Sequence, residues 1–215
     1  MRLVIAGGHG KIALVLTRLA ADRGDTVIGV VRNPDHVDDI RAHGGDGVVL
    51  DLETATVEQV AAVLAGADAV VFAAGAGPGS GIPRKDSVDR GAAALTAEAA
   101  QIAQVRRYVQ ISAMGLDRGS ADDVFSAYLA AKDAAERDLR ARDLDWTIVR
   151  PGRLSDDAPT GRVSLGAATA PGVVSRADVA AVLVAVLDEP RSAGLTLELV
   201  GGDVPVVESV AAVVS

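Results

Sequence analysis

Residues 2–13 read RLVIAGGHGKIA, and this stretch decides the fold. The continuous apolar run Leu3–Ala6 is typical of a strand buried on both faces, because helices cover each side of a parallel sheet. A glycine-rich turn then leads into a helical segment in which Ile12, Leu16 and Leu19 form one apolar stripe. The stretch therefore predicts the first strand, turn and helix of a βαβ unit.

Short apolar runs and longer Ala-rich stretches alternate along the whole chain. We expect strands at Arg2–Ala6, Thr26–Val31, Gly47–Leu50, Ala69–Ala74, Tyr108–Ile111, Thr147–Val149 and Leu195–Val200. We expect helices at Lys11–Asp22, Pro34–Ala42, Thr56–Leu64, Asp86–Gln104, Ala121–Arg142 and Arg176–Asp188. This order predicts an α/β fold, a Rossmann-type doubly wound and mostly parallel sheet with helices on both faces. We expect a single domain over residues 1–215, in which residues 151–175 form a small C-terminal substrate-side region.

Two segments rich in small and turn-forming residues follow predicted strands. They are Gly75–Pro83 and Ser155–Pro171. In an open α/β sheet, the ligand crevice lies beyond the carboxyl ends of the strands. We therefore expect both segments to line that crevice, and ordinary surface loops are the alternative.

The composition excludes several classes of function. None of the 215 residues is cysteine, so there are no disulfides, thiolate nucleophiles or cysteine metal sites. The net charge of −8 argues against general nucleic-acid binding. No apolar run reaches the roughly 18 residues of a membrane span, and a strand beginning at Arg2 leaves no room for a signal peptide. We expect a cytoplasmic, soluble protein with a small-molecule substrate, and a homodimer stays open.

The glycine turn predicts a dinucleotide-binding site. Gly7 allows a sharp exit from the strand, and Gly10 lets the backbone approach a pyrophosphate without an intervening Cβ. Lys11 and Ile12 open the helix, whose first N–H groups face the phosphates, and the small Ala13 lets the helix pack closely on the sheet. A tight turn without a ligand is the alternative.

The end of the second predicted strand indicates which dinucleotide binds. A carboxylate at this place accepts a hydrogen bond from the ribose 2′-hydroxyl of NAD, but here Val31 is followed by Arg32. A guanidinium pairs with a 2′-phosphate through charge-assisted hydrogen bonds. We therefore expect NADP(H) to be preferred over NAD(H), and a merely solvated arginine is the alternative.

The next two strand ends add candidate cofactor contacts. Asp51, followed by Leu52, could accept a hydrogen bond from the adenine amino group or could simply start the following turn. Ala73, Ala74 and Gly75 are small, which lets the backbone lie close to the cofactor ribose.

The histidines and one further arginine carry weaker signals. His9 lies inside the glycine turn, where it is solvated or contacts a phosphate. We interpret His36 and His43 as surface residues of a charged helix. Arg153 either meets an acidic substrate or is a charge on the rim. No cluster has the spacing of metal ligands, so we expect no metal site.

Three later features are more specific. Ser112 directly follows the fifth predicted strand, and Tyr128 and Lys132 lie four residues apart on one helix face. Residues 146–152, WTIVRPG, predict a strand that leaves into a Pro-restricted turn. Together with GGHGKIA at 7–13, this set resembles the short-chain dehydrogenase/reductase superfamily. It is most similar to the atypical subgroup described as NAD(P)H-binding or NAD-dependent epimerase/dehydratase-like, over nearly the whole chain.

The resemblance implies a Ser, Tyr and Lys apparatus beside the nicotinamide, which Ser112, Tyr128 and Lys132 match by motif position. Most relatives add an Asn from the preceding helix. Asp89 stands at that place here, as in many atypical members, and an ionised carboxylate accepts hydrogen bonds but cannot donate them. The resemblance also places Lys132 and Pro151 at the cofactor.

The implied chemistry is hydride transfer with a coupled proton. Lys132 and a positive nicotinamide would favour the phenolate of Tyr128, which exchanges a proton with the substrate oxygen that Ser112 holds. The alternative is that Tyr128 packs and Lys132 is solvated. Two functions follow: an NADP-dependent oxidoreductase acting on a small carbonyl or alcohol, or an epimerase using the same chemistry, and a non-catalytic NADP(H)-binding redox sensor that acts through a protein partner.

Overall fold

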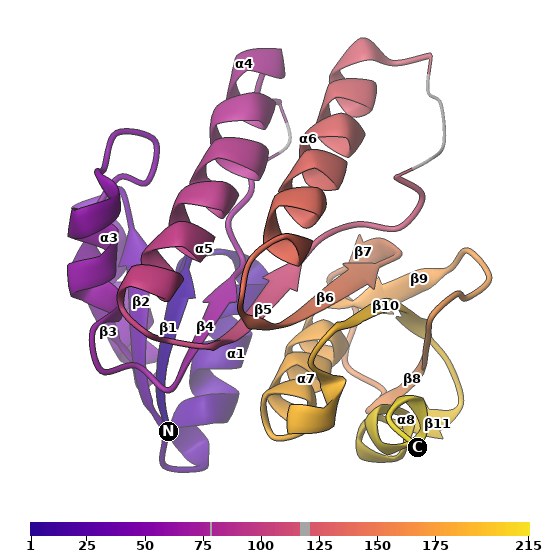
Figure 1. Ribbon diagram of the computed structural model, residues 1–215. Coiled ribbons are helices and arrows are strands. Elements are labelled where there is room, and N and C mark those ends of the chain that lie inside the picture. Colours follow the sequence, from indigo (N-terminus) through magenta and orange to yellow (C-terminus); the bar gives the residue numbers. More distant parts are fainter. Residues whose placement is uncertain (78, 117–120) are drawn as a thin grey trace.

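The computed structural model describes residues 1–77, 79–116 and 121–215 (Figure 1). Within these residues, one sheet of nine strands has the order β11-β8-β10-β6-β5-β4-β1-β2-β3. The strands are β1 (Arg2–Ala6), β2 (Thr26–Val31), β3 (Asp46–Val49), β4 (Ala69–Phe72), β5 (Arg107–Ile111), β6 (Asp145–Pro151), β8 (Arg162–Gly166), β10 (Leu195–Gly201) and β11 (Val204–Pro205). All neighbours pair in parallel except β8, which is antiparallel to β10 and β11. The run β3-β2-β1-β4-β5-β6 is the Rossmann order, so the predicted fold class is confirmed.

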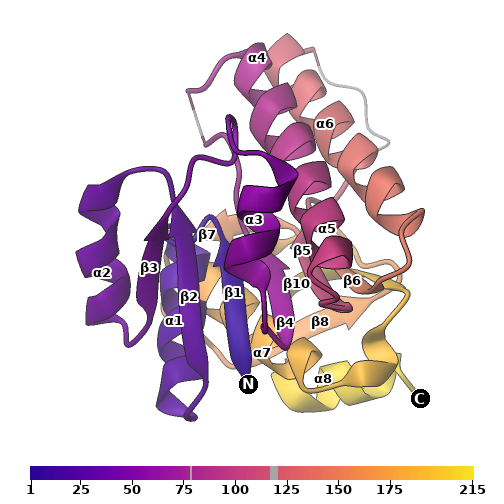
Figure 2. The same ribbon diagram turned by 60° about the vertical axis from the view of Figure 1, so that its left-hand side comes forward.

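Helices cover both faces of the sheet, as Figures 1 and 2 show. One face carries α1 (Lys11–Asp22), α7 (Arg176–Leu187) and α8 (Val206–Val213). The other carries α3 (Val57–Leu64), α5 (Ala93–Ile102) and α6 (Asp123–Arg140). The remaining elements are α2 (Val37–Ala42), α4 (Ile82–Arg84), the 3₁₀ turns η1 (Pro34–His36) and η3 (Pro190–Ser192), the π-helix η2 (Lys85–Ala92), and a small parallel sheet of β7 (Arg153–Ser155) and β9 (Val173–Ser175).

The core has two halves that share the central strand. Leu3 and Ile5 of β1 enter the cluster under α1 and α7, whereas Val4 and Ala6 enter the cluster under α3 and α5. All four side chains are at most 1% exposed, which is the reason why the run is apolar at every position.

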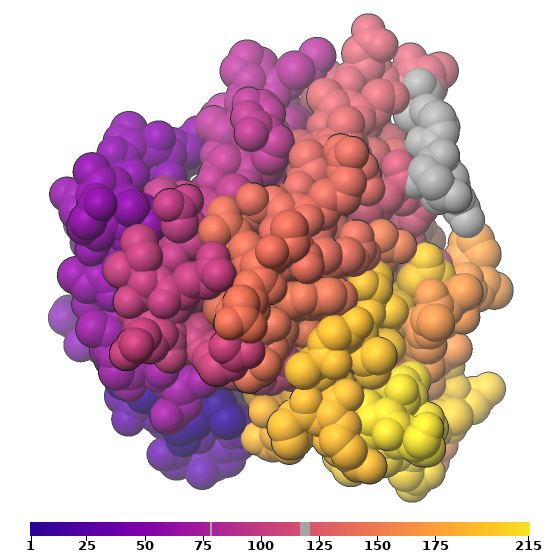
Figure 3. Space-filling model, in the orientation of Figure 1, coloured from indigo at the N-terminus to yellow at the C-terminus, as the bar shows by residue number. Residues whose placement is uncertain are grey.

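A buried ion pair fixes α6 to the sheet. Glu136 is fully buried, and Arg150 of β6 donates to both of its carboxylate oxygens, at 2.8 and 2.6 Å. Arg140 donates to the same carboxylate at 2.6 Å. α6 therefore has a fixed position over β5 and β6, and in Figure 3 its side chains abut those of α5.

The structure corrects several predicted elements. The segment Ser155–Pro171, expected as a loop, contains β8, in which buried Val163 lies between exposed Arg162 and Ser164. The predicted helix Asp86–Gln104 begins earlier, at Ile82, and includes the π-helix. The predicted strand at 69–74 ends at Phe72, and β11 and α8 follow the last predicted strand.

Candidate functional site

The glycine turn after β1 packs directly on β2. The N–H groups of Gly7 and Gly8 both donate to the carbonyl of Val30, at 3.1 and 3.0 Å. Gly7 has φ +84°, and a Cβ on Gly8 would lie 2.5 Å from the Cα of Gly29. Only glycine therefore fits at these two positions. Gly10 has φ −61°, so it needs no glycine for its backbone, and its missing side chain leaves space beside the turn.

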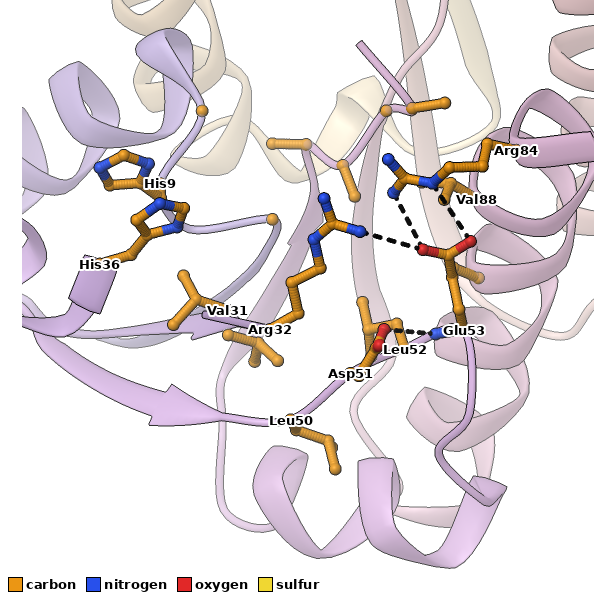
Figure 4. A pocket seen from close by; sticks show the side chains of 18 residues that line it. His9, Val31, Arg32, His36, Leu50, Asp51, Leu52, Glu53, Arg84 and Val88 are labelled. Atoms are coloured by element: carbon orange, nitrogen blue, oxygen red, sulfur yellow. Dashed lines mark hydrogen bonds and ion pairs between the residues drawn. The ribbon is translucent and has the colours of Figure 1, made fainter. Parts of the chain in front are cut away.

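A cavity of about 310 Å³ opens beside this turn (Figure 4). It is lined by Gly7, His9, Gly10, Val30, Val31, Arg32, His36, Leu50, Asp51, Leu52, Glu53, Ala73, Ala74, Gly75, Ala76, Arg84, Val88 and Ala92. These residues come largely from the carboxyl ends of β1 to β4, where ligands bind in this fold. No described side chain caps α1, so its first N–H groups and the positive end of its dipole are open to an anion. The cavity and the uncapped helix fit a dinucleotide.

Most of the predicted cofactor residues line this cavity. They are Gly7, Gly10, Arg32, Asp51, Leu52, Ala73, Ala74 and Gly75. Four others do not line it. The Lys11 ammonium meets Asp156 at 2.5 Å, Ile12 packs against the core, Pro151 is buried at the end of β6, and Lys132 lies on α6. Lys11 and Ile12 can therefore contribute main-chain N–H groups, but the Lys11 side chain has another partner.

Asp51 has a structural partner in the turn after β3. Its carboxylate accepts the N–H of Glu53 at 3.0 Å, as the turn-starting alternative required. Arg32 at the end of β2 has a side chain 56% exposed, and one of its terminal nitrogens lies 3.4 Å from the Glu53 carboxylate. The sequence did not indicate the role of Glu53, because its partners come from distant segments.

The histidines have specific partners, and His36, interpreted from the sequence as a surface residue, also lines the cavity. The rings of His9 and His36 stack with centroids 3.6 Å apart at one wall of the cavity. His9 Nε2 lies 2.7 Å from the carboxylate of Asp39, and His43 Nδ1 lies 2.7 Å from the carbonyl of Asp39. His36 thus lines the cavity, where its ring stacks on that of His9 in the glycine turn. The sequence did not indicate this contact between separate segments.

A second group of predicted residues meets around Asp89, which is fully buried on the π-helix. One carboxylate oxygen of Asp89 accepts the N–H of Ala76 at 3.3 Å, and the other lies 3.2 Å from the Lys132 ammonium. A Cβ on Gly75 would lie 3.3 Å from that second oxygen. Asp89 therefore connects the strand end at the cavity with α6.

Lys132 and Tyr128 have perturbed acidities. The Lys132 side chain is 5% exposed, and its ammonium lies 5.9 Å from the centre of the Tyr128 ring. Burial lowers the pKa of Lys132, and the Asp89 carboxylate opposes this shift. Burial, with a smaller effect of Asp89, raises the pKa of Tyr128 to about 12. At neutral pH the phenol therefore carries its proton and can act as an acid.

Ser112 brings an unused hydrogen-bonding group to the same place. It is 4% exposed, and its hydroxyl has no hydrogen-bond partner among the described residues. Gln110, two residues earlier on the same side of the strand, is 1% exposed with both side-chain polar atoms equally unpartnered in the described chain. The Lys132 ammonium donates to the carbonyl of Ile111, between the two, at 3.3 Å. Such unpaired buried groups are costly unless a ligand or water meets them.

Lys85 is a residue that the sequence reasoning missed. It is 8% exposed, donates to the carbonyl of Gly77 at 2.8 Å, and its ammonium lies 5.3 Å from the centre of the Tyr128 ring. Lys85 precedes Asp89 by four residues, a helical spacing, but the predicted helix began one residue too late to include it.

The other predictions have the following outcomes. Arg153 is exposed on β7. The sequence also predicts Met114–Ala121 as part of the substrate pocket, and residues 117–120 of this segment lie outside the described residues. The described residues contain no group of three or more side chains that could hold a metal ion. Likewise, no helix among them has the length and apolarity needed to cross a bilayer.

The matches with known proteins include both the residues that line the cavity and the group around Asp89. A family model described as NAD(P)H-binding matches residues 7–190. The chain is 34% identical to an uncharacterized sugar epimerase, YhfK, of Bacillus subtilis, over 97% of this chain and 98% of the relative. It is also 34% identical to the UPF0659 protein C216.03 of Schizosaccharomyces pombe, over 97% of this chain and 93% of that protein.

A solved structure has the same architecture. It is a Bacillus halodurans protein assigned provisionally as an NAD-dependent epimerase/dehydratase, with a TM-score of 0.92, 32% identity, and coverage of 99% of this chain and 100% of that one. The glycine turn, the cavity at the strand ends and the length of these matches agree with one another. The chain belongs to the NAD(P)H-binding family.

Proposed function

We propose that this protein is an NADP(H)-dependent oxidoreductase that reduces a small carbonyl compound. The proposal is carried by the Lys132 ammonium, which lies 3.2 Å from Asp89 and 5.9 Å from the centre of the Tyr128 ring. The buried Ser112 hydroxyl, which has no partner among the described residues, supports it. Asp89 contacts both the ammonium of Lys132 and the backbone that follows β4, so the two sites share one wall. The exposed Arg32 at the ribose end of the cavity supports the choice of NADP(H) over NAD(H).

The residues of the chain provide the proton and the positioning. When bound, the reduced nicotinamide supplies the hydride. Ser112 donates a hydrogen bond to the substrate oxygen, which uses its otherwise unpaired hydroxyl. Tyr128, whose pKa is raised to about 12, gives its proton to that oxygen as negative charge develops there. Lys132 stabilises the resulting phenolate, and Asp89 holds Lys132 in place.

The protonation state of Tyr128 decides what the phenol must do in each direction of the reaction. A phenol with a pKa of about 12 is protonated at neutral pH, so the free protein is prepared to donate a proton. Reduction therefore needs no prior ionisation of Tyr128. Oxidation of an alcohol would need the phenolate, which the positive charge of the oxidised nicotinamide favours.

A second candidate is a sugar epimerase, which the description of the Bacillus subtilis relative favours. Tyr128 would then take the proton from a substrate hydroxyl and later return it, while an oxidised nicotinamide, when bound, would accept the hydride from the carbon that bears this hydroxyl and give it back on the other face. Turnover without net consumption of NADPH, on a nucleotide sugar, distinguishes this candidate from a reductase.

The test is made in two steps on purified protein. Calorimetry with NADPH comes first, and absence of heat with both NADPH and NADH at millimolar concentration would refute the proposal. NADPH absorbance is then followed with a panel of aldehydes, ketones and quinones. With a substrate found, Tyr128→Phe should lower turnover by about 10²- to 10⁴-fold, while the affinity for NADPH changes little.

The second tyrosine provides a matched control. Tyr108 is fully buried, and its hydroxyl only reaches the carbonyl of Ala93 at 3.5 Å. Tyr108→Phe removes the same atom away from the polar centre and should keep turnover. Unchanged turnover in Tyr128→Phe would exclude the proton role of Tyr128, and NADPH binding without any turnover would favour the redox sensor.

A further inference from the structure

Glu53 occupies an unexpected place in the cavity. It follows Asp51 and Leu52 after β3, and its side chain is 21% exposed. Figure 4 shows the guanidinium groups of both Arg32 and Arg84 directed at its carboxylate. The contacts are 3.4 Å to Arg32 and 2.9 Å to Arg84, and Ser87 donates a hydrogen bond at 2.6 Å.

The three contacts of Glu53 are unequal. Ser87 and Arg84 lie on the helical segment that begins at Ile82, and both are at good hydrogen-bond distance. The hydrogen bond from Ser87, with the charge of Arg84, lowers the pKa of Glu53, so the carboxylate is ionised at neutral pH. Arg32 is more distant and its side chain is 56% exposed. Glu53 is thus held by the helix, and Arg32 is the partner that can leave.

The arrangement affects the two cofactors differently. A 2′-phosphate at the end of β2 needs the guanidinium of Arg32, which must turn away from Glu53. The carboxylate stays behind, near a dianionic group that it repels. The 2′-hydroxyl of NAD(H) carries no charge, so it neither requires the Arg32 guanidinium nor is repelled by the Glu53 carboxylate. Glu53 therefore penalises NADP(H) and leaves NAD(H) largely unaffected.

We propose that Glu53 is a specificity-determining residue that moderates the preference for NADP(H) by competing for the guanidinium of Arg32. This inference rests on the proposed binding of NADP(H) in the cavity. Its consequence is that the unmodified protein discriminates between the two cofactors less than Arg32 alone would allow.

The test is a double-mutant cycle read by calorimetry, without any substrate. Glu53→Gln should raise the affinity for NADPH by about fivefold, because an exposed ion pair such as that between Glu53 and Arg32 is worth up to about 1 kcal/mol. The affinity for NADH should stay nearly constant. Arg32→Glu should weaken NADPH far more than NADH. In the Arg32→Ala background, Glu53→Gln should change the ratio of the two affinities clearly less, because only the repulsion between the carboxylate and the 2′-phosphate remains.

Controls separate this inference from the proposed function. Glu58→Gln removes the same charge from the exposed face of α3, outside the cavity lining, and should leave the ratio unchanged. Melting temperatures confirm that each variant is folded. If neither cofactor binds, the proposed function fails. If both bind but Glu53→Gln leaves the ratio unchanged, or changes it equally in the Arg32→Ala background, the competition for Arg32 is refuted and the proposed function stands.

Discussion

The Asp89 carboxylate makes two contacts at once, one with a backbone N–H group and one with a buried ammonium group. It accepts the N–H of Ala76 and neutralises the ammonium of Lys132, and it does so without contact with bulk water. An amide at this place, as in most relatives of the resembling superfamily, would keep the first contact and lose the charge. An Asp at this place therefore holds the Lys132 ammonium by charge as well as by hydrogen bonding.

The charge of Asp89 predicts a specific loss of stability. Asp89→Ala leaves the Lys132 ammonium buried without a counter-charge and should lower the free energy of unfolding by about 3 kcal/mol or more. Asp89→Asn keeps an acceptor for Ala76 and should cost less. Urea unfolding measures both. Asp86→Ala is the control, because the exposed ion pair between Asp86 and Arg90 should contribute less than about 1 kcal/mol to the free energy of unfolding. An equal loss of stability in Asp86→Ala and Asp89→Ala would contradict the role of the buried ion pair.

At the scale of elements, two glycines on either side of α1 distinguish two costs of adding a side chain. Gly7 and Gly24 both have positive φ, +84° and +91°. A Cβ on Gly7 would lie 2.6 Å from the Cα of Ala74, whereas a Cβ on Gly24 would meet nothing within 4 Å.

Gly24→Ala should therefore cost about 1 kcal/mol from the backbone alone. Gly7→Ala should cost several kcal/mol, because the end of β4 must also move. The measurement is the free energy of unfolding together with the heat of NADPH binding. Equal losses in the two variants would show that the close approach to Ala74 does not matter.

The elements also show what a sequence can and cannot reveal. β1, the glycine turn and α1 are predictable because their signals lie close together in the sequence, within residues 2–19. Strand β8 was missed because its partner β10 lies about thirty residues further along the chain, so its short alternation becomes a strand only by pairing. The π-helix places Lys85 and Asp89 inside the molecule, and no local pattern distinguishes that geometry from an α-helix.

The site was predictable to the same extent. Ser112, Tyr128, Lys132 and Asp89 follow from motif positions, and the structure brings Asp89, Lys132 and Tyr128 together. Glu53 and its arginine partners could not be predicted, because their roles arise from contacts between segments that are far apart in the sequence.

At the scale of the whole molecule, the shared strand β1 predicts cooperative unfolding. Leu3 and Val4 are adjacent in the sequence but belong to the two opposite halves of the core. Neither half can lose its packing while β1 stays in place, so the chain should unfold in one transition. Scanning calorimetry should give equal calorimetric and van't Hoff enthalpies.

Two substitutions test the two halves of the core, one in each half. Leu3→Ala should lower the midpoint of the single transition, by a loss of about 2–5 kcal/mol, and Val4→Ala should lower the same midpoint by less. A second transition that appears in either variant would show that the two faces unfold independently.

The contact between Glu136 and Arg150 lies one helical turn beyond Lys132 in α6. In Figure 1 the opposite end of this helix rises above the sheet. The same helix also packs against the π-helix that carries Asp89 and against α4. Because the helix that bears both Tyr128 and Lys132 is anchored in this way, the spacing between the phenol and the ammonium is set by the backbone and not by the ligand.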